Sequence, residues 1–386
     1  MSAAYAIVHP NRVLAGEGSV LRLPELAAEF GAKRALIVTD PGVARAGLVA
    51  EPRAALAAAG IAVTVIDDVP PEPEARHAEA AVAAARAAGG ADLVIGIGGG
   101  SAMDVAKLVA VMLAHPLTLS QLLAKAVIPG RGLPSIMVPT TAGTGSEATP
   151  NSIVLVPEDE LKVGIVSPRL VPDAVILDPL LTLTLPAAVT ASTGMDALTH
   201  AIECYCSKKG NPFSDLYGLE AIRLIARSLR RAYADGRDVV ARADMLLGAY
   251  YGGVCIATSS TTAVHALAYP LGGKYRIAHG LSNAMLLPFV MEFNLEGSEA
   301  RFAAMAQAMG LPVAGLDERT AGLRMIDALY GLNADLAISS SLADQGVGED
   351  DVDGLVEGAA KVTRLLDNNP RPMTRDDMRA IYRRLF

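Results

Sequence analysis

The order of its apolar segments constrains the fold of this chain more than any other feature. In the first half, short β-branched runs alternate with alanine-rich stretches of helical length, which is typical of parallel strands joined by crossover helices. Strands are expected at residues 35–39, 62–66, 93–97, 135–138 and 174–177. After about Pro186, stretches with helical periodicity follow one another, such as 214–231 and 238–252. The sequence therefore predicts an α/β domain over residues 1–186 and an all-helical domain over residues 187–386.

Composition and charge exclude several classes of function. The chain has 33 Lys+Arg against 41 Asp+Glu, a net charge of −8, and no basic run that could follow a phosphate backbone, so we expect no nucleic-acid partner. No apolar run approaches the roughly 18 residues that span a bilayer, and the opening MSAAYAIVHP does not have the pattern of a secretory signal. Cys204, Cys206 and Cys255 are expected to be small buried hydrophobes in a reducing cytoplasm.

A glycine-rich turn follows the strand expected at 93–97. Gly98, Gly99, Gly100 and Ser101 come directly before a stretch with helical spacing. Glycines let the backbone approach a phosphate, and the N–H groups and dipole of a helix start favour its negative charge. The dinucleotide pattern G-x-G-x-x-G is not satisfied, because Ser101 stands three residues after Gly98. A tight turn with Ser101 as an ordinary N-cap explains the same residues.

A second loop, PTTAGTGSE at residues 139–147, follows the strand expected at 135–138. Its hydroxyl side chains and open N–H groups suit phosphate and ribose oxygens. Ser, Thr and Gly also cluster in solvated turns, so that alternative stays open.

Asp40 ends the strand expected at 35–39. A carboxylate there can bond ribose hydroxyls and would repel a 2′-phosphate, which favours NAD over NADP. An aspartate that only opens a turn fits equally well. In the usual fingerprint the acid lies about 20 residues after the glycines, whereas Asp40 precedes them. If both segments contact one cofactor, the strand order is not the usual one.

The helical half contains a candidate set of metal ligands. Asp196 and His200 are four residues apart and would share one helix face. His265 lies in a helical stretch, and His279 lies in a glycine-containing loop. One carboxylate and three imidazoles suit Fe²⁺ or Zn²⁺ with a position left for substrate, although each histidine alone fits a core or surface role. Glu203, one turn beyond His200, could be a partner that supports a ligand, but an acid on the helix surface is expected.

Taken together, the segments GGGSAMDVAK (98–107), PTTAGTGSE (139–147), GMDALTHAIE (194–203) and HALAYPLGG through AHGLSNAMLLP (265–288) form a recognisable combination. With them, the chain resembles the iron-containing (group III) alcohol dehydrogenase family over nearly its whole length. The resemblance implies an α/β N-terminal dinucleotide-binding domain followed by an all-α metal-binding domain, the architecture of dehydroquinate synthase. It implies a metal-dependent, NAD(P)-linked dehydrogenase that interconverts a small alcohol and its aldehyde or ketone by hydride transfer.

The resemblance also implies which residues form the site. The family's metal ligands fall on Asp196, His200, His265 and His279, and Fe²⁺ or Zn²⁺ is the expected ion. The family's cofactor-binding positions fall on Asp40, Gly99, Gly100, Ser101, Asp104, Thr140, Thr141, Thr144, Ser146, Lys162 and Leu181, with NAD expected. Several relatives carry a histidine where Tyr269 stands here, and relatives often carry one where Phe289 stands, so no catalytic residue is assigned. A homodimer or larger homo-oligomer is expected.

Two other functions stay open at this point. A lyase of the dehydroquinate synthase type would use the same fold, NAD and a metal but return the hydride to its substrate. A non-catalytic metal- or nucleotide-binding protein would retain the ligands without turnover.

Overall fold

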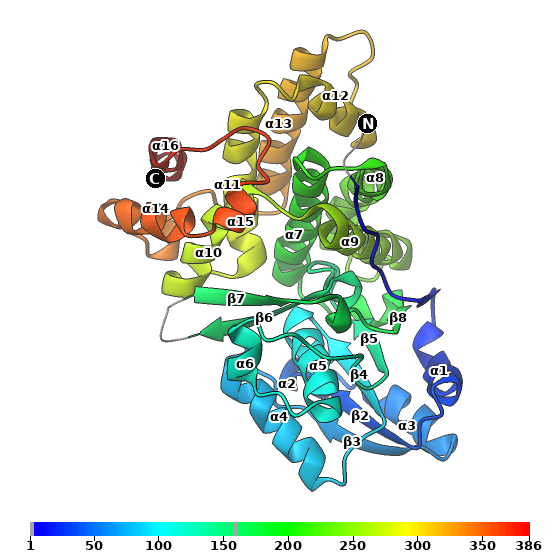
Figure 1. Cartoon of the computed structure of the whole chain (residues 1–386). Helices are drawn as coiled ribbons and strands as arrows, with labels where there is room; N and C mark the ends of the chain where they lie inside the picture. The colour runs from blue at the N-terminus through cyan, green and yellow to red at the C-terminus, as the bar shows by residue number, and fades with distance from the viewer. Residues whose placement is uncertain (1–3, 157–160) are drawn as a thin grey trace. The chain divides into compact units, whose positions relative to one another are not determined.

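The computed structural model describes residues 4–156 and 161–386, with the backbone alone at 161 and 162. Contacts divide the chain into two compact units, one being Val8–Thr184 and the other chiefly Leu185–Phe386. The first contains a parallel sheet covered by helices and the second is helical, which confirms the predicted fold class (Figure 1).

A six-stranded sheet forms the centre of the first unit, in the order β1-β8-β5-β4-β2-β3 with every pairing parallel. Its strands are β1 (Arg12–Ala15), β2 (Arg34–Val38), β3 (Ala62–Ile66), β4 (Leu93–Gly98), β5 (Ser135–Pro139) and β8 (Ala174–Leu177). All the expected strands form, with bounds that differ from the expected ones by no more than a residue. The edge strand β1 was not expected, because it is short and mostly exposed and so lacks a long apolar run.

The strand order contains a reversal between β2 and β4. The chain places β3 on one side of β2 and then crosses back to place β4 on the other side. Open α/β sheets bind ligands at such a switch point, outside the carboxyl ends of the strands. Asp40 follows β2 and Gly99 follows β4, so both predicted cofactor segments flank the switch point. The strand order therefore differs from that of the usual dinucleotide-binding sheet, as expected if Asp40 and the glycine turn contact one cofactor.

Alternate strand residues pack on opposite faces of the sheet. Leu36 and Val38 belong to a core with α4 (Ala75–Ala87), α5 (Gly100–Ala114) and α6 (Leu119–Leu123). Ala35 and Ile37 belong to a second core with α1 (Leu23–Glu29) and α3 (Ala50–Ala58). Both faces are therefore covered, which explains why the strands have continuous apolar runs.

Shorter elements complete the first unit. The helix α2 (Pro41–Arg45) follows β2, and short 3₁₀ turns occur at η1 (Ser19–Arg22), η2 (Ser146–Ala148), η4 (Pro168–Leu170) and η5 (Pro179–Thr182). An antiparallel hairpin of β6 (Asn151–Val156) and β7 (Leu161–Val166) was not expected from the sequence. The strand β6 contacts α5, so the hairpin begins beside the second loop.

The second unit contains the helices α7 (Ala187–Cys206), α8 (Pro212–Ala234), α9 (Val239–Ser259), α10 (Ala263–Tyr275), α11 (His279–Asn294), α12 (Glu299–Ala308), α13 (Glu318–Asp335), α14 (Val352–Ala360), α15 (Thr363–Leu366) and α16 (Arg375–Arg383). The turns η6 (Ala343–Gln345) and η7 (Glu349–Asp351) precede α14. The predicted helix at 214–231 lies within α8, and the one at 238–252 corresponds to α9, which begins one residue later, after its N-cap Asp238. The three cysteines are buried and reduced, as expected.

The helices α7, α8 and α9 pack against one another and form one side of the helical unit. Among the described residues, α9 is the one helix long and apolar enough to cross a membrane, and 61% of its apolar window is buried. Core helices of soluble proteins have the same length and composition, so this is weak evidence for a membrane span.

Candidate functional site

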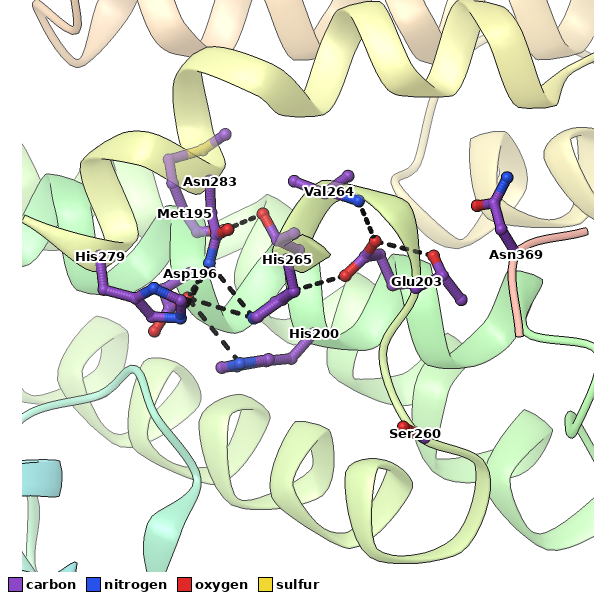
Figure 2. A network of polar contacts seen from close by, with 12 residues as sticks. Met195, Asp196, His200, Glu203, Ser260, Val264, His265, His279, Asn283 and Asn369 are labelled. Carbon is purple, nitrogen blue, oxygen red and sulfur yellow. Dashed lines mark hydrogen bonds and ion pairs between the residues drawn. The ribbon is translucent and has the colours of Figure 1, made fainter. Parts of the chain in front are cut away.

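The four predicted metal ligands lie together in the helical unit. Asp196 and His200 project from α7, His265 from α10 and His279 from the first position of α11 (Figure 2). One ligand atom from each residue lies within 4.8 Å of all the others. The Nε2 atoms of His200, His265 and His279 lie 3.8, 3.9 and 3.8 Å from Oδ1 of Asp196. The arrangement therefore points three imidazole nitrogens at one carboxylate oxygen.

The placement of His279 in a loop was wrong, because α11 begins at this residue. The glycine after it, Gly280, serves close helix packing rather than a turn. A Cβ at Gly280 would lie 2.2 Å from the carbonyl oxygen of Ser192 on α7. Only a residue without a Cβ allows α11 to start this close to α7, and that approach brings His279 to Asp196.

Burial and charge act together on the carboxylate of this cluster. The side chains of Asp196, His200 and His265 are 4–6% exposed, and that of His279 is 29% exposed. Burial raises the pKa of Asp196, but the three histidines and a hydrogen bond from Asn283 outweigh burial and hold the pKa below its usual value. The cluster therefore presents an anionic oxygen beside imidazole nitrogens, which is a donor set for a divalent cation.

Glu203 is not on the helix surface as expected, because it is fully buried. Its Oε2 lies 2.5 Å from Nδ1 of His265. Its Oε1 accepts hydrogen bonds from the backbone N–H of Val264 at 2.6 Å and from the hydroxyl of Thr262 at 2.7 Å. With Nδ1 engaged by the carboxylate, Nε2 of His265 is the nitrogen that faces the cluster, and the ring orientation is fixed.

The sequence did not single out Asn283, which also reaches the cluster. Its Nδ2 donates to Oδ1 of Asp196 at 2.7 Å and lies 3.2 and 3.3 Å from Nε2 of His265 and His279. Asn283 stands four residues after His279, so the helical spacing of the two polar residues was the available signal.

In the first unit, the glycine turn forms an open helix start. The helix α5 begins at Gly100, with Gly99 as a cap residue that has no side chain. The N–H of Met103 donates to Gly99, so the N–H groups of the three residues before it have no intrahelical acceptor. Ser101 is not the N-cap, and its Oγ accepts from the N–H of Glu72 at 3.3 Å. This end of α5 therefore has the geometry of an anion site.

The second loop packs against this helix start. A Cβ at Gly100 would lie 2.8 Å from Cγ2 of Thr144, and a Cβ at Gly99 would lie 3.6 Å from Oγ1 of Thr141. The N–H of Thr140 donates to the carbonyl of Gly98 at 3.0 Å. The loop is thus held against the glycine turn rather than extending into solvent.

Asp104 and Ser146 are bonded to each other. The Oγ of Ser146 donates to Oδ1 of Asp104, and the N–H of Ile153 donates to Oδ2 at 2.9 Å. Both residues are buried, with 7% and 5% of their surface exposed. Their visible role is to join α5 to the second loop.

Asp40 caps α2 with one carboxylate oxygen and directs the other at the glycine turn. Its Oδ1 accepts from the N–H groups of Gly42 at 2.8 Å and Val43 at 3.0 Å, so it caps α2. Its Oδ2 faces the glycine turn, where a Cβ at Gly98 would lie 3.1 Å away. One oxygen is used by the cap, and the other lies beside the candidate phosphate loop.

The last two predicted cofactor residues lie elsewhere in the unit. Leu181, in η5, is 7% exposed and packs in the core with α1 and α3. Lys162 is paired with Leu155 in the hairpin, but its side chain lies outside the described residues.

Known families match both parts of the chain. Residues 190–386 match the family described as the Fe-containing alcohol dehydrogenase family, C-terminal, and residues 10–179 match the one described as iron-containing alcohol dehydrogenase. The chain belongs to the iron-containing alcohol dehydrogenase family. Family membership confirms the resemblance inferred from the four sequence segments, and it makes the protein an oxidoreductase.

Individual relatives cover the whole chain. Long-chain-alcohol dehydrogenase 1 of Geobacillus thermodenitrificans is 42% identical over 98% of this chain and 96% of its own. The crystal structure of a 1,3-propanediol oxidoreductase superposes with a TM-score of 0.96 at 37% identity, covering 100% of both chains. A sulfoacetaldehyde reductase from Bifidobacterium kashiwanohense in complex with NAD⁺ gives 0.90 at 29% identity, covering 100% and 99%. These iron-containing alcohol dehydrogenase relatives are named for dehydrogenase or reductase activity, so neither the lyase nor the non-catalytic alternative is favoured.

Proposed function

We propose that the protein is an NAD-dependent dehydrogenase that interconverts a small alcohol and its aldehyde or ketone by hydride transfer. The observation that carries the proposal is the cluster of Asp196, His200, His265 and His279, whose ligand atoms lie within 4.8 Å of one another. Two relatives named for small substrates, a 1,3-propanediol oxidoreductase and a sulfoacetaldehyde reductase, support this class, and the long-chain-alcohol dehydrogenase supports alcohol chemistry alone.

The donors in the cluster fit a divalent ion such as Fe²⁺ or Zn²⁺. Three imidazole nitrogens and one carboxylate oxygen are ligands that both ions accept. Glu203 supports the fit because its bond to Nδ1 of His265 directs Nε2 to the cluster. Such an ion, when bound, supplies a Lewis acid that lowers the pKa of an alcohol and polarises a carbonyl. The chain's part is to hold the donors converged in a buried, anionic site.

Residues of the first unit would bind NAD. The N–H groups at the start of α5 would bind the pyrophosphate next to Gly99, Gly100 and Ser101. The hydroxyls of the second loop, on Thr140, Thr141, Thr144 and Ser146, would line the same cofactor. Oδ2 of Asp40 would accept from ribose hydroxyls, which favours NAD over NADP. The family resemblance places Lys162 near the nicotinamide half of the cofactor, and Leu181 is a looser match to the family's cofactor positions. Asp104, which the resemblance puts beside the pyrophosphate loop, supports the second loop through its bond with Ser146.

No side chain is assigned as a general base. By the family resemblance, Tyr269 stands where several relatives carry a histidine, and its ring lies 6.0 Å from that of His279. Burial raises the pKa of Tyr269, so its hydroxyl stays protonated and is a poor base. Phe289, the other histidine position, packs edge-on against Tyr330. The proton of the alcohol therefore leaves through water or a ribose hydroxyl.

The proposal includes the organisation of the protein. Residues 1–186 would form the dinucleotide-binding domain and residues 187–386 the metal and substrate domain. The chain would act in the cytoplasm as a homodimer or larger homo-oligomer, without a nucleic-acid or membrane partner. Light scattering after size exclusion would give the mass of the assembly, and a monomer would contradict this part.

The test of the function is NADH formation or consumption against a panel of primary alcohols, small diols, hydroxy acids and their carbonyls. Wild-type protein should turn over at least one alcohol and carbonyl pair, whereas His200→Ala should lose both bound metal and turnover. The matched control is His115→Ala, whose ring bonds the Arg131 carbonyl in the other unit. NAD binding without turnover on any pair would contradict the proposal.

A further inference from the structure

A buried lysine that the proposed function does not use lies two turns after the start of α5. The side chain of Lys107 is 1% exposed, and its Nζ lies 3.1 Å from Oδ1 of Asp104, whose side chain is 9% exposed. A buried ammonium is costly unless it is paired and fully hydrogen-bonded. The partners of Lys107 therefore indicate what its burial achieves.

All the other acceptors of Lys107 belong to the segment that ends the second loop. Its Nζ donates to the carbonyl of Ser146 at 2.9 Å, to the carbonyl of Asn151 and, more weakly, to the hydroxyl of Thr149 at 3.5 Å. One ammonium thus bonds the backbone at two points five residues apart. That arrangement fixes the path of the segment between them.

Asp104 holds the same segment from the other side of the pair. Its carboxylate accepts from the hydroxyl of Ser146 and from the N–H of Ile153. Its own carbonyl accepts from the hydroxyl of Ser152 at 3.0 Å. The two charged residues together bond a continuous stretch from Ser146 to Ile153, and both come from one turn of α5.

We propose that Lys107 is a positioning residue for the dinucleotide, which with Asp104 holds the second loop against the start of α5. This inference rests on the proposed function. The second loop packs closely against the helix start, since a Cβ at Gly100 would lie 2.8 Å from Cγ2 of Thr144. Fixing the segment after Ser146 therefore keeps the hydroxyls of Thr141 and Thr144 next to the N–H groups that would bind the pyrophosphate.

The positive charge of Lys107 has a second effect, on the binding of an anion at the start of α5. An unpaired carboxylate on Asp104 would lie within the first turns of the helix whose N-terminus is to receive an anion, and it would oppose that anion. Pairing with Lys107 balances this charge. Lys107 therefore both orders the loop and reduces the repulsion between the carboxylate of Asp104 and an anion bound at the start of α5.

The test uses Lys107→Met, which keeps most of the unbranched side chain and removes its donors and charge. NADH affinity by fluorescence titration and KM for NAD should worsen roughly 10-fold to 100-fold, as expected for lost hydrogen bonds to a charged group. The kcat at saturating NAD should change by less than about 3-fold, since the bound cofactor reacts in the same way. Hydrogen exchange should rise over residues 139–149, and iron content should stay unchanged.

The control is Arg86→Met, which removes a cation that bonds the Met112 carbonyl near the far end of α5. It should leave NADH affinity and exchange in the loop as in wild type. An unchanged NADH affinity in Lys107→Met would overturn the inference, as would faster exchange over the whole unit with no local excess.

The double variant Asp104→Asn/Lys107→Met keeps the test decisive if the single variant does not fold, because it leaves no unpaired buried charge. Compared with Asp104→Asn alone, it should still bind NADH about tenfold more weakly, because the bonds to the loop are lost. Equal affinity in the two variants would overturn the positioning role. A wild-type protein that binds no NADH would instead contradict the proposed function, so the two failures are distinguishable.

Discussion

Glu203 and His265 form a buried carboxylate–imidazole pair, with Oε2 of the glutamate 2.5 Å from Nδ1 of the histidine. The pair joins α7 to α10, and the same glutamate holds the backbone N–H of Val264. Since α7 also carries Asp196 and His200, Glu203 fixes the position of His265 on one helix relative to these two proposed ligands on another.

We expect Glu203→Ala to weaken metal binding by about 10-fold to 100-fold, the usual effect of removing the hydrogen-bond partner of a ligating histidine. Calorimetric titration of chelator-stripped protein with Zn²⁺ would measure this. Glu220→Gln, an exposed carboxylate on α8 paired with Arg223, is the control and should bind as wild type does. Equal affinities in all three proteins would mean that the pair does not orient the ligand.

Gly280 limits how close α11 can come to α7. In Gly280→Ala the new Cβ would start 2.2 Å from the carbonyl oxygen of Ser192, so the helices must separate and carry His279 away from Asp196. We expect a loss of about 1 to 3 kcal/mol in the free energy of unfolding, together with weaker metal binding. Urea denaturation and metal titration would report the two effects.

Gly331, in α13, has open space where a Cβ would be placed. The control Gly331→Ala should therefore be neutral or stabilising by up to about 1 kcal/mol. If Gly280→Ala behaved like this control, the close approach of α7 and α11 would not matter to the site.

The two oxygens of Asp40 can be separated by mutation. Asp40→Ser keeps a capping oxygen for α2 but removes the carboxylate, so stability should change little while the preference for NAD over NADP falls. Asp40→Ala removes both and should cost about 1 kcal/mol more in unfolding free energy. The ratio of kcat/KM for the two cofactors, measured beside thermal unfolding, checks both statements. An unchanged ratio in Asp40→Ser would leave Asp40 with the cap alone.

Glu147 makes stability depend on pH. Burial raises its pKa from 4.5 to about 7, although a hydrogen bond from its own backbone and the charge of Lys107 partly offset this. The protonated form is favoured in the fold, so this contribution is complete below pH 4.5 and is lost as pH rises through 7. The loss amounts to roughly 3 kcal/mol at high pH.

Glu147→Gln removes this titration. Between pH 5 and 8, the unfolding free energy of wild type should fall by up to about 3 kcal/mol more than that of the variant. Urea denaturation at each pH would measure the difference. Parallel pH profiles for the two proteins would show that Glu147 keeps an ordinary pKa in the fold.

The sheet could be predicted from the sequence because its strands are buried on both faces. Their apolar runs, bounded by turn residues, reveal each strand without reference to its neighbours. The strand β1 was not predicted because its four residues are mostly exposed. The hairpin of β6 and β7 was not predicted because it is antiparallel and is not part of the alternation of parallel strands and helices. The strands that could be predicted are thus those whose own residues form an apolar run, without reference to a neighbouring strand.

The four residues of the cluster could be predicted from the sequence, whereas the residues that hold them in place could not. The residues Asp196 and His200 share a helix turn, and His265 and His279 are the other histidines of the helical half. Glu203 was misplaced because the atoms that bury it come from about 60 residues further along the chain. The role of Lys107 could not be predicted for the same reason. Its backbone acceptors lie about 40 residues further along the chain, and the sequence of its own helix does not indicate them.

The most direct test of a metal-dependent dehydrogenase is turnover with NAD measured against added Fe²⁺ in chelator-stripped protein. Activity should rise from near zero to a plateau at about one ion per chain, consistent with one cluster of four ligands. His265→Ala should stay inactive at every iron concentration. Full activity of the stripped wild-type protein, or a plateau reached equally by His265→Ala, would contradict the mechanism.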